Sequence, residues 1–117
     1  MIARLAIAAA FNAVLVTSAG AAQLVMLEQA GCPWCEAWDR EVGGIYPKTE
    51  EGSRAPLRRI DIHAPLPEDL RFLRKEYFTP TFVLVDDGRE LGRIRGYPGE
   101  ELFWWQLDEL MAELPEN

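Results

Sequence analysis

The stretch Gln23–Val42 reads QLVMLEQAGCPWCEAWDREV, and it decides the fold. Its first seven residues are mostly apolar and suit a buried strand, which Gly31 then breaks. Proline is favoured in the first turn of a helix, where its missing N–H costs nothing. A helix is therefore predicted from Pro33 to Val42, ended by the two glycines that follow. The pattern places a Cys-Pro-Trp-Cys motif, Cys32–Cys35, where a strand gives way to a helix.

This position makes the two cysteines a strong redox signal. A cysteine at a helix N-terminus faces unpaired backbone N–H groups and the positive end of the helix dipole, which stabilise its thiolate. Because the thiolate is the nucleophile, we predict that Cys32 attacks and that Cys35, one turn further in, resolves the mixed disulfide. Two alternatives stay open: a structural disulfide, and half of a zinc site that bridges a dimer.

The rest of the chain alternates between strand and helix patterns. Three further strands are predicted, over Leu57–Ile62, Thr81–Val85 and Glu90–Arg95, with a hairpin turn at Asp86-Asp87-Gly88 between the last two. Ile45–Pro56 is predicted to be a loop with at most a short helical turn. Two further helices are predicted: one opens at Pro67 and has the apolar stripe Leu66, Leu70, Leu73 and Tyr77, and the other covers Glu100–Leu114. The first half is a crossover connection, hence parallel, and the second half ends in a hairpin. We expect an α/β fold in which a central four-stranded mixed sheet is flanked by helices on both faces.

The N-terminus has the three-part layout of a secretory signal peptide. A single early charge, Arg4, precedes the apolar run Leu5–Val16 and a set of small residues. Cleavage is predicted after Ala21, with Ala22 as the second choice, so that 1–21 is the signal peptide and 22–117 the mature domain. The apolar run is shorter than the roughly 20 residues that span a bilayer. The alternative is an uncleaved membrane anchor.

Composition narrows the class of protein. The chain has 117 residues, of which 49% are hydrophobic, so one folded domain is expected rather than a disordered chain. Its net charge is −7, and this acid excess argues against a nucleic-acid binder. With 2 cysteines, the chain cannot be a scaffold stapled by several disulfides, nor form a Cys-only zinc site by itself.

A second motif, Thr79-Pro80, comes just before the strand predicted at Thr81–Val85. With the Cys-x-x-Cys motif, it makes the sequence resemble the thioredoxin superfamily from Gln23 to Leu114. The resemblance implies a thioredoxin-like fold in which Pro80 is cis and Thr79 offers its backbone to an incoming peptide. It also implies that Gly96 and Tyr97 complete the substrate groove. Trp34 lies between the two cysteines in sequence, and we predict that it contacts substrate as well.

One position departs from the thioredoxin pattern. Thioredoxins carry a buried aspartate in the first strand, where this chain has Met26, and Glu28 is the candidate replacement. The motif also resembles the Cys-Pro-Tyr-Cys of glutaredoxins. The stretches Gly31–Cys35 with Trp38-Asp39, Ile45–Thr49 and Ala55–Arg59 are similar to the small periplasmic thioredoxin-like SoxS proteins of bacterial sulfur-oxidation gene clusters. That family is implied to keep thiols of the sulfur-oxidising machinery reduced.

We expect a monomeric periplasmic enzyme that reduces protein disulfides through its dithiol. It needs no metal or organic cofactor, because the cysteine pair carries the two electrons. Its electron donor would be a membrane thiol transporter of the DsbD/CcdA type. Two rivals stay open: an oxidase or isomerase of envelope disulfides, and a non-catalytic module that binds thiols or a metal.

His63, the single histidine, is predicted to be a loop residue without a catalytic part. Arg89, Arg93 and Arg95 are predicted to protect an edge strand from aggregation.

Overall fold

A computed structural model describes residues 22–115, so the predicted signal peptide, 1–21, lies outside the described residues. Four strands form one mixed sheet in the order β2-β1-β3-β4. β1 (Ala22–Glu28) runs parallel to β2 (Leu57–Asp61), whereas β3 (Thr81–Asp86) is antiparallel to both β1 and β4 (Arg89–Arg95). This is the α/β arrangement predicted from the sequence, with a crossover first and a hairpin second.

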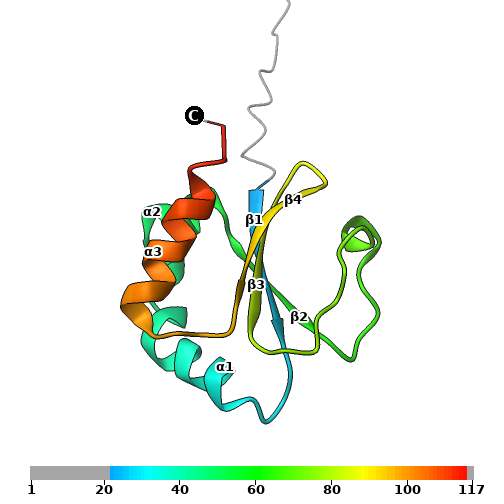
Figure 1. Cartoon of the computed structure of the whole chain (residues 1–117), viewed down its shortest axis with the longest axis horizontal. Coiled ribbons are helices and arrows are strands. Elements are labelled where there is room, and N and C mark those ends of the chain that lie inside the picture. Colours follow the sequence, from blue (N-terminus) through cyan, green and yellow to red (C-terminus); the bar gives the residue numbers. More distant parts are fainter. Residues whose placement is uncertain (1–21, 116–117) are drawn as a thin grey trace, which may run out of the picture.

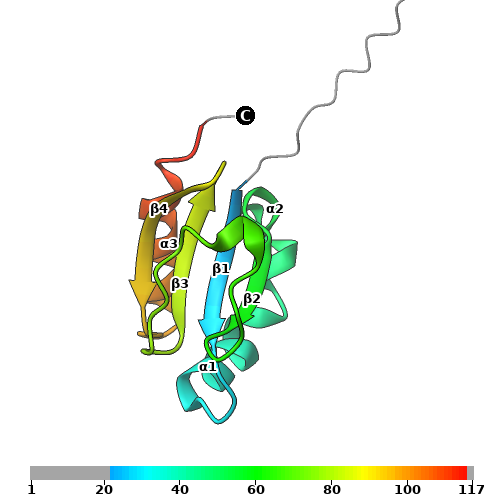
Figure 2. The ribbon, with the colours of Figure 1, turned by 90° about the vertical axis from the view of Figure 1, so that its right-hand side faces the viewer.

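The three α-helices lie on one face of the sheet (Figures 1 and 2). They are α1 (Pro33–Trp38), α2 (Glu50–Arg54) and α3 (Glu100–Met111). Between them and the sheet lies the larger apolar core, at whose centre Trp38, Phe82 and Phe103 are fully buried. The ring centroids of these three residues are 4.9 to 5.8 Å apart, in the tilted and edge-to-face arrangements that aromatic pairs prefer.

The opposite face is covered without an α-helix, so the helix predicted to open at Pro67 is wrong. Between β2 and β3 the structure has a single 3₁₀ turn, Glu68–Leu70, and otherwise irregular chain (Figure 2). Leu66, Leu70 and Leu73 still pack against the sheet, but Tyr77 of the predicted stripe is 79% exposed. The apolar stripe therefore predicted burial correctly for its three leucines but predicted the wrong backbone conformation. Contacts with the sheet determine that conformation, because tertiary packing overrides a weak helical propensity.

The connection from α1 to β2 is more helical than the sequence suggested. After Trp38 the helix widens into a π-helical turn, Asp39–Gly43, so that the helical stretch still ends next to Val42 as predicted. The predicted loop over Ile45–Pro56 contains a 3₁₀ turn, Tyr46–Lys48, and α2, whose first turn is capped by the Thr49 hydroxyl. Among residues 22–115, no helix has both the length and the apolar character needed to cross a bilayer.

The β3–β4 hairpin forms where the sequence predicted it. Asp87 and Gly88 have φ of 50° and 75°, and together they make a two-residue turn with positive φ at both positions. Such turns match the right-handed twist of the flanking strands. The hairpin makes β4 the edge strand and leads the chain back to the end of the sheet where β1 stops and α1 begins (Figure 1).

Candidate active site

The two cysteines lie where β1 ends and α1 begins. Gly31 turns the chain with a φ of 71°, Cys32 caps the helix, and Cys35 lies in its first turn. The two form a disulfide with Cα atoms 5.2 Å apart, inside the usual range. The backbone N–H of Cys35 donates to Cys32 Sγ at 3.2 Å. A Cys32 thiolate would therefore accept a hydrogen bond from the helix N-terminus, as the sequence predicted for the attacking sulfur.

The segment before β3 folds against this sulfur. The Thr79–Pro80 peptide bond is cis, as the resemblance implied, and the Thr79 carbonyl oxygen lies 3.4 Å from Cys32 Sγ. On the other side, the Gly96 N–H donates to the Pro80 carbonyl at 2.7 Å. The structure thus brings Cys32, Thr79, Pro80 and Gly96 together, although they come from three separate parts of the sequence.

Gln29 is a neighbour of the site that the sequence analysis missed. Its Nε2 donates to Thr79 Oγ1 at 2.9 Å, and its Oε1 lies 3.1 Å from Nε2 of His63. An amide oxygen only accepts, so the His63 ring is the donor in this pair. His63 therefore lies two hydrogen bonds from Thr79 and has no contact with the sulfurs among the described hydrogen bonds. The only signal for Gln29 was a polar residue at the end of the predicted strand.

Aromatic side chains near the cysteines differ in their exposure to solvent. Trp34, predicted to contact substrate, is 61% exposed, and Tyr77 and Phe78, which the sequence analysis did not assign to the site, are also exposed. The Tyr97 ring is buried instead, with its centroid 6.1 Å from that of Phe103. Burial raises the pKa of the Tyr97 hydroxyl, and Glu41 adds to this. A substrate contact at Gly96 and Tyr97 would therefore use their backbone rather than the ring.

Arg59 pairs with two acids close to the active-site helix, Glu28 and Asp39. Met26 is fully buried where thioredoxins carry their aspartate, and Arg59 reaches it from β2 with Nη1 3.7 Å from Sδ. Arg59 pairs at 2.6 Å with both Glu28 and Asp39, and its guanidinium lies 5.7 Å from the centroid of the Trp38 ring. The hydrogen bond to Asp39 is the main reason why the pKa of Arg59 is raised. Glu28, the candidate replacement for the missing aspartate, is thus paired with an arginine.

Residues 22–115 hold no group of three or more His, Cys, Asp or Glu side chains placed to bind a metal ion. The chemistry that the site does contain is the pair of sulfurs, with a helix N-terminus on one side and the Thr79 carbonyl on the other.

Comparisons with known proteins agree with this site. No protein-family model matches the sequence, and no curated protein matches it. Among solved structures, the chain is similar to the periplasmic thioredoxin SoxS from Paracoccus pantotrophus in its reduced form, with 46% identity and a TM-score of 0.74 over 78% of this chain and 96% of that one. It is also similar to the thioredoxin Mala s 13 of Malassezia sympodialis, with 15% identity and a TM-score of 0.52 over 77% of this chain and 75% of that one, which shows a shared fold alone.

The first of these relatives is matched along nearly its whole length at an identity that shows common family membership. The fold, the Cys32–Cys35 disulfide and the cis Pro80 beside it agree with that relationship. The chain therefore belongs to the thioredoxin superfamily, as a member of its SoxS group of thiol–disulfide oxidoreductases.

Proposed function

We propose that this protein reduces disulfides of other proteins in the periplasm. The observation that carries the proposal is the environment of Cys32 Sγ, which accepts the N–H of Cys35 at 3.2 Å and lies 3.4 Å from the Thr79 carbonyl. The first contact favours a thiolate, and the second places a backbone acceptor beside the sulfur, where a bound peptide could pair with it. The signal peptide predicted at 1–21 and the periplasmic SoxS relative support the compartment.

The reaction is a two-electron exchange in two steps. The Cys32 thiolate attacks one sulfur of the substrate disulfide, so that a mixed disulfide forms and one substrate thiolate leaves. Cys35, as thiolate, then attacks Cys32 Sγ and releases the second substrate thiolate. The protein finishes with its Cys32–Cys35 disulfide, and the substrate has gained two electrons and two protons. A membrane thiol transporter of the DsbD/CcdA type would return the protein to its dithiol form.

The charges around the cysteines favour the reducing direction. Pro33 and Trp34 between them carry no charge, and Glu36 is an acid in the first turn of α1. An acid at that place opposes a thiolate, so the dithiol is stabilised less than in strong oxidants such as DsbA, whose potential is about −120 mV. We expect a potential below about −200 mV. Proteins of the sulfur-oxidising machinery are the proposed substrate class, as the sequence resemblance to the SoxS proteins implies.

Two cysteine variants test the mechanism. Cys32→Ser should abolish reduction of insulin disulfides by a thiol donor, because Cys35 alone has no second thiol with which to form the internal disulfide that releases the reduced substrate. Cys35→Ser should still attack but should accumulate as a mixed disulfide with its protein substrate, visible on a non-reducing gel. Preferential alkylation of Cys35 rather than Cys32 in the reduced wild type at neutral pH would reverse the assigned roles.

Equilibration with glutathione or dithiothreitol buffers distinguishes the proposal from its rivals. A potential near −120 mV would make the protein an oxidase instead of a reductase. A stoichiometric metal in the reduced protein would favour a metal-binding module. In cells, the pair should be mostly reduced and should become oxidised when the membrane donor is deleted.

A further inference from the structure

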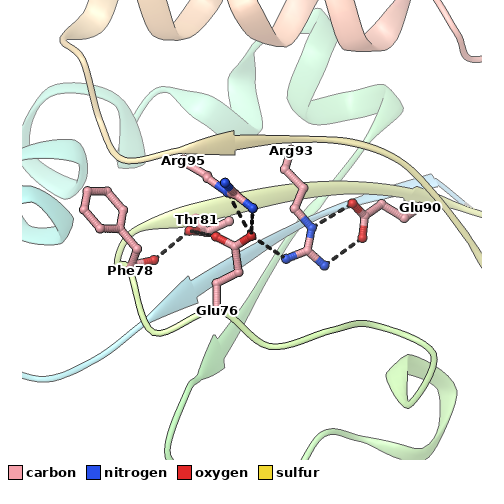
Figure 3. A network of polar contacts seen from close by, with 6 residues as sticks. All are labelled: Glu76, Phe78, Thr81, Glu90, Arg93 and Arg95. Atoms are coloured by element: carbon pink, nitrogen blue, oxygen red, sulfur yellow. Dashed lines mark hydrogen bonds and ion pairs between the residues drawn. The ribbon is translucent and has the colours of Figure 1, made fainter.

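Three charged residues join the segment before Pro80 to the edge of the sheet (Figure 3). Glu76 Oε1 accepts from Arg95 Nε at 2.9 Å and lies 2.6 Å from Arg95 Nη2. The same oxygen is 3.3 Å from Arg93 Nη1, and Arg93 in turn pairs with Glu90 at 2.7 Å. Both arginines project from β4, so a carboxylate of the irregular chain is held by the edge strand. We refer to Glu76, Arg93 and Arg95 as the clamp.

Two of the three clamp side chains are largely shielded from water. The side chains of Glu76 and Arg93 are each 10% exposed, whereas that of Arg95 is 62% exposed. Arg93 Nη1 is buried without a well-aligned hydrogen bond, so its 3.3 Å approach to Glu76 is a charge contact. Loss of Glu76 would leave Arg93 Nη1 buried without an acceptor, while Glu90 still pairs with the other side of the guanidinium. This is more disruptive than the loss of an exposed pair.

The residues that follow the clamp form one wall of the active site. Phe78 is exposed, and its ring lies against Gly96, where an added Cβ would approach Phe78 Cε1 to 3.1 Å. The Phe78 carbonyl accepts from the Thr81 hydroxyl at 2.6 Å (Figure 3). Thr79 comes next, with its carbonyl beside Cys32 Sγ. Thr79 is only three positions after Glu76, so a shift of the carboxylate moves the wall directly.

The segment that forms this wall has no helical hydrogen bonds of its own. The chain from Arg71 to Pro80 has no regular secondary structure, so side-chain contacts have to replace a backbone ladder. Gln29 holds the Thr79 hydroxyl from the β1 side, and the clamp holds the preceding residues from the β4 side. The two contacts therefore hold the segment from the two strands that flank β3.

We infer that Glu76 is a positioning residue for protein substrates: clamped by Arg93 and Arg95, it holds Phe78 and the Thr79 carbonyl where an extended peptide can dock beside Cys32. The inference rests on the proposed exchange with protein thiols and disulfides. A small disulfide needs only the Cys32 sulfur, whereas a polypeptide also needs the wall, so the clamp acts on protein substrates alone. Its loss lowers the fraction of molecules that are ready to bind, which raises KM.

Glu76→Gln, Arg95→Gln and the double variant test the clamp. We expect Glu76→Gln to raise KM for insulin about threefold to tenfold with kcat within about twofold, because the charge-assisted contacts to Arg95 and Arg93 are weakened. The rate of Cys32 alkylation by iodoacetamide and the rate with 5,5′-dithiobis(2-nitrobenzoate) should stay at the wild-type values. The double variant should be no worse than Glu76→Gln, because both changes break the same contact. Glu109→Gln removes the same charge from an exposed position on α3 and is the matched control.

The outcomes separate the inference from the proposed function. An unchanged KM in Glu76→Gln, or alkylation slowed as much as insulin reduction, would overturn the positioning role, whatever happens to the melting temperature. If the wild type reacts with the small disulfide but not with insulin, the reductase proposal fails. The same ratio of protein to small-molecule rates is then measured in the oxidising direction, with reduced ribonuclease against a small thiol. A ratio that Glu76→Gln leaves unchanged there would also overturn the inference.

Discussion

Residues of one chemical type have separate tasks in this chain because their burial differs. Trp38 is fully buried between Phe82, Phe103 and Tyr46, and Arg59 lies over its ring. Trp34 and Trp105 are 61% and 60% exposed. Trp104, the neighbour of Trp105, packs against the larger core instead, since neighbours in a helix cannot share a face.

A pair of tryptophan variants tests this difference. Trp38→Ala should lower the free energy of unfolding by about 3–5 kcal/mol, because it empties the centre of the larger core. Trp105→Ala should change it by less than about 1 kcal/mol, because the ring is mostly in solvent. Urea unfolding followed by circular dichroism measures both, and equal losses would contradict the core described around Trp38.

At the scale of elements, α3 packs closely against β4 because β4 has a glycine, Gly92, at the point of contact. A Cβ at Gly92 in β4 would overlap the Leu110 side chain of α3. This contact holds the last helix against the hairpin, and the hairpin in turn carries Arg93 and Arg95 of the clamp. A single strand, β4, therefore contacts α3 through Gly92 and holds the segment beside Cys32 through Arg93 and Arg95.

Two glycine variants should change stability in opposite directions. Gly92→Ala should destabilise by about 1–3 kcal/mol, since either Leu110 or the strand has to move. Gly44→Ala should stabilise by about 0.4–1 kcal/mol, because Gly44 has a helical φ of −72° and nothing within 4 Å of its added Cβ. Thermal unfolding of the two variants beside the wild type gives the signs, and a destabilising Gly44→Ala would contradict the described backbone.

For the whole molecule, the acid excess has two opposite effects on stability. Burial alone would raise the pKa of Glu76, but Arg95 and Arg93 outweigh it and hold the pKa below its ordinary 4.5. Burial raises the pKa of Asp108 above its ordinary 3.8, and neighbouring Glu51 raises it further. Acids with a cationic partner therefore stabilise the fold at neutral pH, and acids that face other acids weaken it.

The pH dependence of two variants should show these opposite signs. Between the lowered folded pKa of Glu76 and 4.5 the unfolded state binds more protons, so the stabilisation is complete above about pH 4.5 and is lost as the pH falls through the folded value. Glu76→Gln should thus lower stability at pH 7 by about 1 kcal/mol, with a smaller difference at pH 3.

For Asp108 the folded state binds more protons, and its penalty grows as the pH rises from 3.8 through the raised folded pKa. Asp108→Asn should stabilise the protein at pH 7 by about 0.5 kcal/mol, a value kept small by solvent screening, and should have little effect at pH 3. Urea titrations at both pH values measure the differences. The same sign for the two variants at pH 7 would contradict the described charge environment.

The sequence by itself determined the local parts of this protein. The apolar run of β1, the proline after Cys32 and the Asp87-Gly88 turn each have a conformational preference that needs no distant partner. The Cys-x-x-Cys pair at a helix start and Pro80 before β3 were therefore recognisable, and with them the fold class and the reacting sulfurs. These features depend on backbone conformation within a few residues, which composition and spacing report directly.

Only the tertiary structure decided how the second face of the sheet is covered and what surrounds Cys32. The helical spacing of Leu66, Leu70 and Leu73 marked burial correctly, but the backbone between them follows contacts with the sheet. Glu76 finds its arginines on β4, and Gln29 finds Thr79 some 50 residues away in sequence. A hydrogen bond or ion pair between distant residues leaves no periodic pattern, because its geometry exists only after the sheet has brought the two segments together.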